Sequence, residues 1–115
     1  MVNLSERRMD AVFTALADPT RRRMIARLSR GSATIGELGR PFSITKPAVT
    51  KHIKLLERAG LVRRRKHGRI HRCTLETKPM QQAQDWIERY RKFWQQSLDG
   101  LARFLDETKP EGEDT

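Results

Sequence analysis

The hydrophobic residues in the first half of the chain recur at intervals of three and four, the spacing of helices that bury one face. The first such stripe consists of Met9, Val12, Phe13 and Leu16. Asp18 is a good N-cap and Pro19 fits the first helical position, so a second helix begins there and stops at Gly31. Its inward-facing residues are Met24, Ile25 and Leu28. The pattern therefore predicts two short consecutive helices.

Two further helices follow, joined by a tight connection. Thr34 and Glu37 have the spacing of a capping box, which predicts a short third helix. Thr45 is a good N-cap for a fourth helix over residues 45–59, and Pro47 is tolerated in its first turn because that amide lacks a helical partner. The fourth helix carries Val49, Ile53 and Leu56 on one face. Two helices joined so closely are typical of a helix-turn-helix.

The spacing changes to a period of two in the next segment. Residues 61–66 and 70–75 are short runs that bracket a turn with Gly68 at its tip, which predicts a β-hairpin. One face of the second run carries His71, Cys73 and Leu75. A hairpin that follows a helix-turn-helix makes it winged.

A single long helical pattern extends from Pro79 to about Asp106, which at about 1.5 Å per residue makes a helix about 42 Å long. Its apolar stripe comprises Met80, Ala83, Ile87, Tyr90, Trp94, Leu101 and Phe104, widened by Trp86, Phe93, Leu98 and Leu105. The preceding residues cannot cover so much apolar surface from one side, so pairing with a second copy of the chain is expected. Packing on the first helix of the same chain is the alternative, and we expect both in part.

Positive charge is concentrated in one third of the chain. The formal net charge is +10. Residues 40–72 contain eleven basic residues and one acidic residue, Glu57, so the rest of the chain is neutral. A cluster of this size is typical of a protein that binds nucleic acid, although a basic surface that only keeps the chain soluble is the alternative.

The helix-turn-helix directs this charge toward duplex DNA. The second helix of such a pair enters the major groove with its first turns against the base edges. The residues expected to read bases there are Lys46, Pro47, Thr50 and Lys51, with Lys54 beside the flanking phosphates. The residues of the wing expected in the minor groove or on phosphates are Arg63, Arg64, Arg65, Lys66 and Arg69.

These predictions divide the chain into three parts. Residues 1–76 are expected to form a winged helix-turn-helix DNA-binding domain, residues 77–107 a C-terminal dimerisation helix, and residues 108–115 a polar, disordered tail. The expected fold class is mainly α with a small β-hairpin, in the order α-α-α-α-β-β-α.

Other function classes lack their motifs. The single cysteine, Cys73, excludes an internal disulfide and suits a reducing cytoplasm. The chain has no C-x-x-C zinc pair, no G-x-x-x-x-G-K phosphate loop and no G-x-S-x-G nucleophile turn. It also has no apolar run of the ~18 residues that a membrane span needs, and no secretory signal pattern. We therefore expect a cytoplasmic protein that is not an enzyme and uses no cofactor or membrane.

Three stretches of the sequence resemble the ArsR/SmtB family of bacterial winged-helix repressors. They are residues 15–25 (ALADPTRRRMI), 44–56 (ITKPAVTKHIKLL) and 59–62 (AGLV), with Gly68-Arg69 in the wing. The last helix is most similar to a branch of the family with an aromatic W-x-x-x-Y-x-x-F-W pattern, here Trp86, Tyr90, Phe93 and Trp94. The resemblance spans about residues 9–105. It implies a homodimer, joined by its first and last helices, that binds operator DNA and usually represses transcription.

The metal sites of that family have no counterpart here. Metal-sensing members carry Cys-x-Cys in the third helix, whereas residues 34–39 read TIGELG. An alternative family site uses Asp and His in the last helix, where this chain has Asp85 and Glu88 but no histidine. The other candidate donors, His67, His71 and Cys73, fall short of a zinc set, and Cys73 is expected to be a core residue rather than a redox sensor.

We therefore expect a sequence-specific transcriptional regulator, a homodimeric repressor that occludes a promoter, its own among the candidates. The residues expected at its dimer interface are Met9, Phe13, Ile87, Tyr90, Trp94, Leu101 and Phe104. A twofold dimer is expected to read a pseudo-palindromic operator with half-sites about one helical turn apart, or a multiple of it. Two alternatives remain open. One is a winged-helix module that binds another protein through its last helix, and the other is a sensor gated by a thiol or by a small ligand near Trp86, Tyr90 and Trp94.

Overall fold

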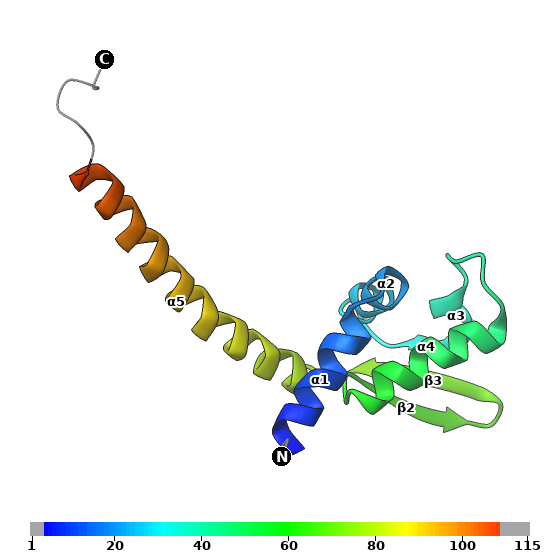
Figure 1. Cartoon of the computed structure of the whole chain (residues 1–115). Helices are drawn as coiled ribbons and strands as arrows, with labels where there is room; N and C mark the ends of the chain where they lie inside the picture. Colours follow the sequence, from blue (N-terminus) through cyan, green and yellow to red (C-terminus); the bar gives the residue numbers. More distant parts are fainter. Residues whose placement is uncertain (1–3, 109–115) are drawn as a thin grey trace. The chain divides into compact units, whose positions relative to one another are not determined.

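The computed structural model describes residues 4–108, and the predicted disordered tail, residues 108–115, lies outside them except for Thr108. The elements in chain order are α1 (Leu4–Leu16), α2 (Pro19–Leu28), β1 (Ala33–Thr34), α3 (Ile35–Gly39), α4 (Lys46–Arg58), β2 (Val62–His67), β3 (Ile70–Leu75) and α5 (Lys78–Glu107) (Figure 1). One compact unit extends to Ala83, and a second begins at Gln84 within α5. The predicted winged helix-turn-helix and its long last helix are confirmed.

Three helices begin at the caps that the sequence predicts. The side chains of Asp18, Thr34 and Thr45 each accept a hydrogen bond from the backbone N–H three residues on, at 3.0, 3.1 and 3.3 Å. These bonds satisfy amides that have no partner in a first helical turn. Pro19 and Pro47 occupy the first turns of α2 and α4, where no donor is needed. The caps determine where α2, α3 and α4 begin, and hence which face each helix turns inward.

β2 and β3 form the predicted hairpin. They pair antiparallel from Val62↔Leu75 to His67↔Ile70. Gly68 has φ +63°, the positive sign that a two-residue type II′ turn requires at its first central position. A residue with a Cβ would be strained there, so the glycine is needed for the conformation of the turn.

The sheet has a third strand that the sequence pattern missed. β1 pairs antiparallel with β3 as Ala33↔Cys73 and Thr34↔Arg72, which gives the strand order β1-β3-β2. Two residues are too few to show a period of two, and the partner strand lies far along the sequence. The expectation of a hairpin alone was therefore incomplete, and β1 ties the start of α3 to the wing.

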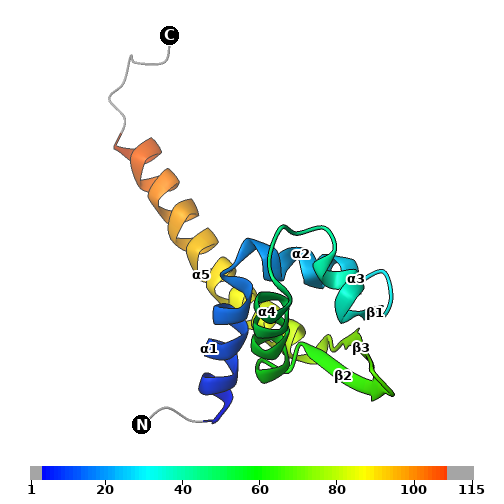
Figure 2. The same ribbon diagram turned by 90° about the vertical axis from the view of Figure 1, so that its right-hand side faces the viewer.

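The core lies around α4, which packs against α1, α2, α3 and β2. Figure 2 shows α4 between α1 and the hairpin. The largest fully buried side chains come from α1 to α4, from β3 and from the connection after α4: Val12, Met24, Leu38, Ile53, Leu56, Leu61 and Cys73. The first turn and a half of α5 also belongs here, since Ala83 is buried and Met80 packs against the core. Burial on this side leaves the opposite side of α4 free to face a partner.

The second unit is the remainder of α5 up to Glu107. Its large apolar residues are exposed in the single chain, as described below. None of the helices in the described part of the chain has the length and apolar character to cross a lipid bilayer.

Candidate nucleic-acid interface

The outward side of α4 forms one continuous surface. Its lining residues are Lys46, Pro47, Thr50, Lys51 and Lys54, around a shallow depression of about 470 Å³. These are the five residues of α4 that the sequence predicts to face DNA, and the structure brings them together because they recur at helical spacing opposite the buried face. We call this surface the recognition face.

A close approach of α3 to α4 positions the recognition face. A Cβ on Gly39 would lie 2.7 Å from Cγ2 of Val49, so no larger residue fits without a shift of the neighbouring helix. Val49 is itself buried on the inner side of α4. The glycine at the end of α3 therefore allows the tight helix-turn-helix crossing that turns the recognition face outward.

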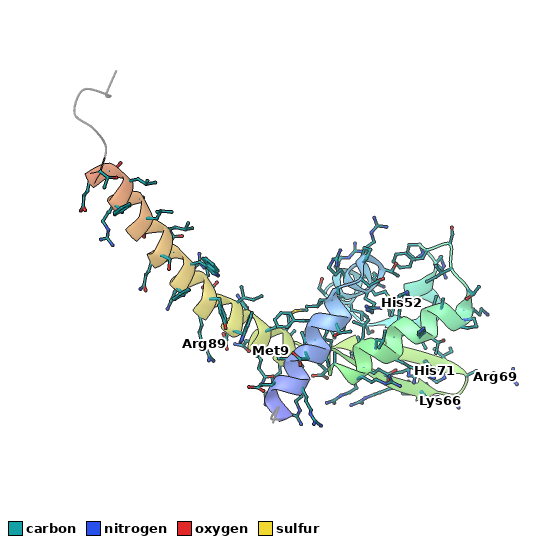
Figure 3. The ribbon with its side chains drawn as sticks, in the orientation of Figure 1. Met9, His52, Lys66, Arg69, His71 and Arg89 are labelled. Carbon is teal, nitrogen blue, oxygen red and sulfur yellow. The ribbon has the colours of Figure 1, made fainter. Side chains whose placement is uncertain are left out.

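The five wing cations do not share one surface. Side chains alternate along β2, so Arg64 and Lys66 lie on one face of the sheet and Arg63 and Arg65 on the other. Lys66 and Arg69 lie toward the tip of the hairpin (Figure 3). The sequence predicts all five as DNA contacts, but only some of them can meet the same segment of duplex directly.

Two of these arginines already have acidic partners within the chain. Nε of Arg64 lies 3.2 Å from Oε1 of Glu57 on α4, and both side chains are less than a third exposed. Nε of Arg63 lies 3.2 Å from Oε1 of Glu76 in a more exposed pair. In the described part of the chain, Arg65, Lys66 and Arg69 form no ion pair and are exposed. The wing cations whose charge is not neutralised by an acidic partner are therefore those at or near the hairpin tip.

A groove separates the hairpin from α3 and the first turns of α4, with a volume of about 780 Å³. We call it the wing groove. Its cationic residues are Arg40, Lys46, Arg64 and Arg69, and its apolar residues include Ile35, Ile44, Val49 and Ile70. The hydroxyl-bearing residues Thr34 and Thr50, the imidazole of His71 and two glycines, Gly36 and Gly39, complete the lining. Lys46 and Thr50 line both the wing groove and the recognition face, so the two surfaces are continuous.

Sequence reasoning missed several residues of the wing groove. Arg40 belongs to the basic segment, which was a signal that it could be functional. Ile44 and Ile70 are exposed, and their apolar character gave no indication of a site. Only the packing of α3 beside the hairpin brings these three residues to one groove.

Cys73 has the environment of a core residue. Its side chain is 0% exposed, and burial, with a smaller contribution from the Glu57 carboxylate, raises the pKa of the thiol. A buried, protonated thiol is a poor nucleophile and a poor metal ligand. Among residues 4–108, no three His, Cys, Asp or Glu side chains gather as a metal site would require.

The predicted dimerisation residues fall into two groups. Ile87, Tyr90, Trp94, Leu101 and Phe104 on α5 are between 49% and 60% exposed in the single chain. On α1, Met9 is half-buried, and Phe13 is half-buried and packs against the core. Two rings of α5 are in contact, with the centroids of Trp86 and Tyr90 4.3 Å apart and their planes tilted by 41°. A single helix cannot enclose a ligand, so an effector pocket near these aromatic residues needs a second element.

Comparisons with known proteins agree with this geometry. A family model described as a helix-turn-helix domain matches residues 16–65. The HTH-type transcriptional regulator Rv2034 of Mycobacterium tuberculosis is 36% identical over 106 residues, which cover 92% of this chain and 94% of that protein. The transcriptional repressor SdpR of Bacillus subtilis is 32% identical over 79 residues, 69% of this chain and 88% of that protein. The crystal structure of an ArsR family transcriptional regulator, RHA00566, matches with a TM-score of 0.73 and 41% identity, over 76% of this chain and 97% of that one.

Proposed function

Because the chain belongs to the ArsR family of winged helix-turn-helix transcriptional regulators, which are DNA-binding proteins and not enzymes, we propose that it is a homodimeric repressor. The protein acts in the cytoplasm, where each copy binds one half-site of a pseudo-palindromic operator in double-stranded DNA. The bound dimer occludes a promoter. One observation carries the proposal: the recognition face and the wing groove form one cationic surface, joined through Lys46 and Thr50.

The recognition face suits the major groove. The outward side of the first turns of α4, with Lys46, Pro47 and Lys51 exposed, can approach the base edges. Lys46 and Lys51 can donate to O6 and N7 of guanine, and Thr50 can hydrogen-bond a base or contact a thymine methyl group. Lys54 lies one turn further along α4, in position for a flanking phosphate. Pro47 contributes shape without a charge.

The wing groove suits the sugar-phosphate strand between the two DNA grooves. If α4 occupies the major groove and the hairpin tip the adjacent minor groove, one backbone strand must pass between them. Lys46 and Arg69 can neutralise its phosphates from either side of the groove. Ile44 and Ile70, exposed in the free chain, can pack against the C–H faces of its deoxyriboses.

The wing arginines contribute unequally in this arrangement. Arg65, Lys66 and Arg69 are available to DNA in the free chain. Arg63 and Arg64 contact phosphates only if DNA displaces Glu76 and Glu57 from them. Their binding contribution is therefore the difference between two ion pairs, and it is smaller than that of a free cation.

The exposed face of α5 supports the dimer. Its large apolar residues are more than soluble monomers usually leave in water, and a second copy of α5 offers the matching surface. Ile87, Tyr90, Trp94, Leu101 and Phe104 would be buried between the copies. The contribution of Met9 and Phe13 on α1 rests on the resemblance to family members that pair through their first and last helices.

The experiment is a titration of the purified chain against duplex DNA from upstream of its own gene, in excess competitor DNA. We expect retained binding for the wild type and loss of binding for Lys51→Glu combined with Arg69→Glu, with the dimer intact by light scattering. Lys92→Glu with Arg103→Glu changes the net charge equally on α5 and should retain binding. Wild-type binding no stronger than to competitor DNA at every salt concentration would contradict the proposal.

Two further arms separate the alternatives. Added divalent metal ions should leave DNA affinity unchanged, because the usual family sites lack their cysteine and histidine ligands here. A thermal-shift screen with small apolar or electrophilic molecules tests the gated sensor, which would show a stabilising ligand that also releases DNA. A chain that is dimeric but indifferent to DNA would favour the protein-interaction module.

A further inference from the structure

The guanidinium group of Arg21 on α2 bonds two other helices at once. Its Nε donates to the backbone carbonyl of Ala15 at 2.7 Å, and its Nη2 donates to that of Thr14 at 3.0 Å. Its Nη1 lies 3.1 Å from Nδ1 of His52 on α4, a residue labelled in Figure 3. Arginine can only donate, so Nδ1 of His52 is the acceptor and carries no proton. One side chain therefore connects the last turn of α1 to the middle of the recognition helix.

The connection is geometrically well determined. The last carbonyls of α1 lie beyond its i→i+4 hydrogen bonds, although that of Thr14 also accepts from the Ala17 amide at 3.2 Å, and α1 has no basic residue in its own last turn. The planar fork of Arg21 binds two of these carbonyls and fixes the direction of its third nitrogen. Asp18 belongs to the same region, because its Oδ2 accepts a hydrogen bond from the Arg21 amide at 3.0 Å.

A neighbouring arginine makes half of this arrangement. Nη1 of Arg22 donates to the carbonyl of Leu16 at 2.8 Å, so Arg22 also caps the end of α1. This bond of Arg22 reaches α1 and not α4. The pair thus separates two roles within adjacent residues: closing the end of α1, which both perform, and holding α4 to that end, which only Arg21 performs through His52.

We infer that Arg21 is a positioning residue that sets the separation and orientation of the two recognition helices in the dimer. The inference rests on the proposed function, in which α1 helps to join the copies and α4 reads DNA. The path from the interface to the bases then passes through the bonds of Arg21 to Thr14, Ala15 and His52. A rigid path makes the dimer sensitive to half-site spacing, whereas a loose one lets each α4 adjust independently.

Sensitivity of binding to half-site spacing is a property that the loss of a merely structural residue would not change. One inserted base pair turns one half-site by about 35° and shifts it by about 3.4 Å relative to the other. A rigid dimer must lose contacts on such a duplex. A general loss of stability would instead weaken binding to both duplexes in the same proportion.

The experiment uses an operator selected in vitro from random duplexes by the wild-type chain, and the same operator with one base pair inserted between its half-sites. The measured quantity is the dissociation constant for the duplex with the inserted base pair divided by that for the selected operator. We expect Arg21→Gln and His52→Leu each to reduce the wild-type ratio by about three- to tenfold, the worth of one net hydrogen bond. Arg22→Gln is the matched control and should keep the wild-type ratio.

His52→Leu keeps both bonds of Arg21 to α1, so it decides the matter if Arg21→Gln fails to fold. A wild-type ratio in both folded variants would overturn the role of Arg21 and leave the proposed function standing. A wild type that selects no duplex would overturn the proposed function and this inference together, whereas a wild type that binds both spacings equally would overturn this inference alone. Reduction of the ratio by Arg22→Gln as well would assign the effect to the cap of α1 and overturn the link to α4.

Discussion

α4 and α5 are both amphipathic helices, yet their apolar faces end in different surroundings. Val49, Ile53 and Leu56 of α4 are at most 5% exposed, because neighbouring elements of the same unit pack on them. The large apolar residues of α5 beyond Ala83 are 37% to 61% exposed in the single chain. The same periodicity thus indicates that a face will be covered, and it leaves open whether the cover comes from the same chain or another.

The polar faces of the two helices also differ, in the arrangement of their charges. On α4 the polar face is a compact cationic surface of Lys46, Lys51 and Lys54, with almost no acidic residue nearby. On α5 the charges alternate in sign, as in the pair of Arg91 Nη2 with Glu88 Oε2 at 3.1 Å. In the proposed function, α4 therefore presents its charge to a polyanion, and α5 presents its charge to water and its apolar side to a partner.

The largest expected effect tests the buried side of α4. Ile53→Ala removes a side chain that is 0% exposed and should lower the free energy of unfolding by about 2–5 kcal/mol, measured by chemical denaturation. Lys54→Ala, on the exposed side of the same helix, should change it by no more than about 0.5 kcal/mol. Equal losses from the two variants would contradict the packing of α4 described here.

The next effect tests the apolar face of α5. Trp94→Glu places a charge in the proposed interface and should weaken the dimer by about 2 kcal/mol or more, roughly thirtyfold, in sedimentation experiments. Gln96→Glu adds the same charge on the polar side of the helix and should leave the dimer intact. If both variants dimerise like the wild type, the interface lies elsewhere on the chain.

A third prediction distinguishes a free wing cation from a paired one. A dimer that contacts about eight phosphates should show a log–log salt dependence of binding with a slope of about −7. Arg69→Ala should reduce the size of this slope by about one for each copy. Arg64→Ala should reduce it less, because Glu57 already pairs with that side chain. Anisotropy titrations over a salt series measure both, and an equal change would show that DNA displaces Glu57.

The smallest effect concerns the cap of α2, a helix that packs against α4. The backbone N–H of Arg21, followed by the charge of Arg21, lowers the pKa of the Asp18 carboxyl in spite of partial burial. A lowered pKa in the folded state means that the ionised carboxylate stabilises the fold at neutral pH and that this stabilisation is lost as the pH falls below about 4. Asp18→Ala should cost about 1 kcal/mol at pH 7 and progressively less in acid. A cost independent of pH would argue against the ionised cap.

Local features were predictable wherever their cause lies within a few residues. The caps at Asp18, Thr34 and Thr45 and the turn at Gly68 depend on hydrogen bonds and dihedral angles of adjacent residues, and the structure has all four. The shared surface of the recognition face follows from helical spacing alone. β1 was missed because its two residues are strand only by virtue of pairing with β3.

The candidate site was predictable in its residue types more than in its connections. Alternation along β2 already implied that Arg63 and Arg64 face opposite ways. Their pairing with Glu76 and Glu57 had no local signal, since each pair needs the hairpin to close and to lie against its neighbours. Ile44 and Ile70 likewise had no local signal, because they line the wing groove only when the hairpin and α3 lie on its two sides.

The amino-acid sequence alone determined the helices, the hairpin and the location of the excess charge, because spacing, capping and net charge are properties of short stretches of chain. The tertiary structure decided which cations remain unpaired, that a glycine at position 39 lets α3 and α4 touch, and that Arg21 holds the end of α1 to α4. Each of these depends on atoms that are distant along the chain and meet only when the core around α4 is packed.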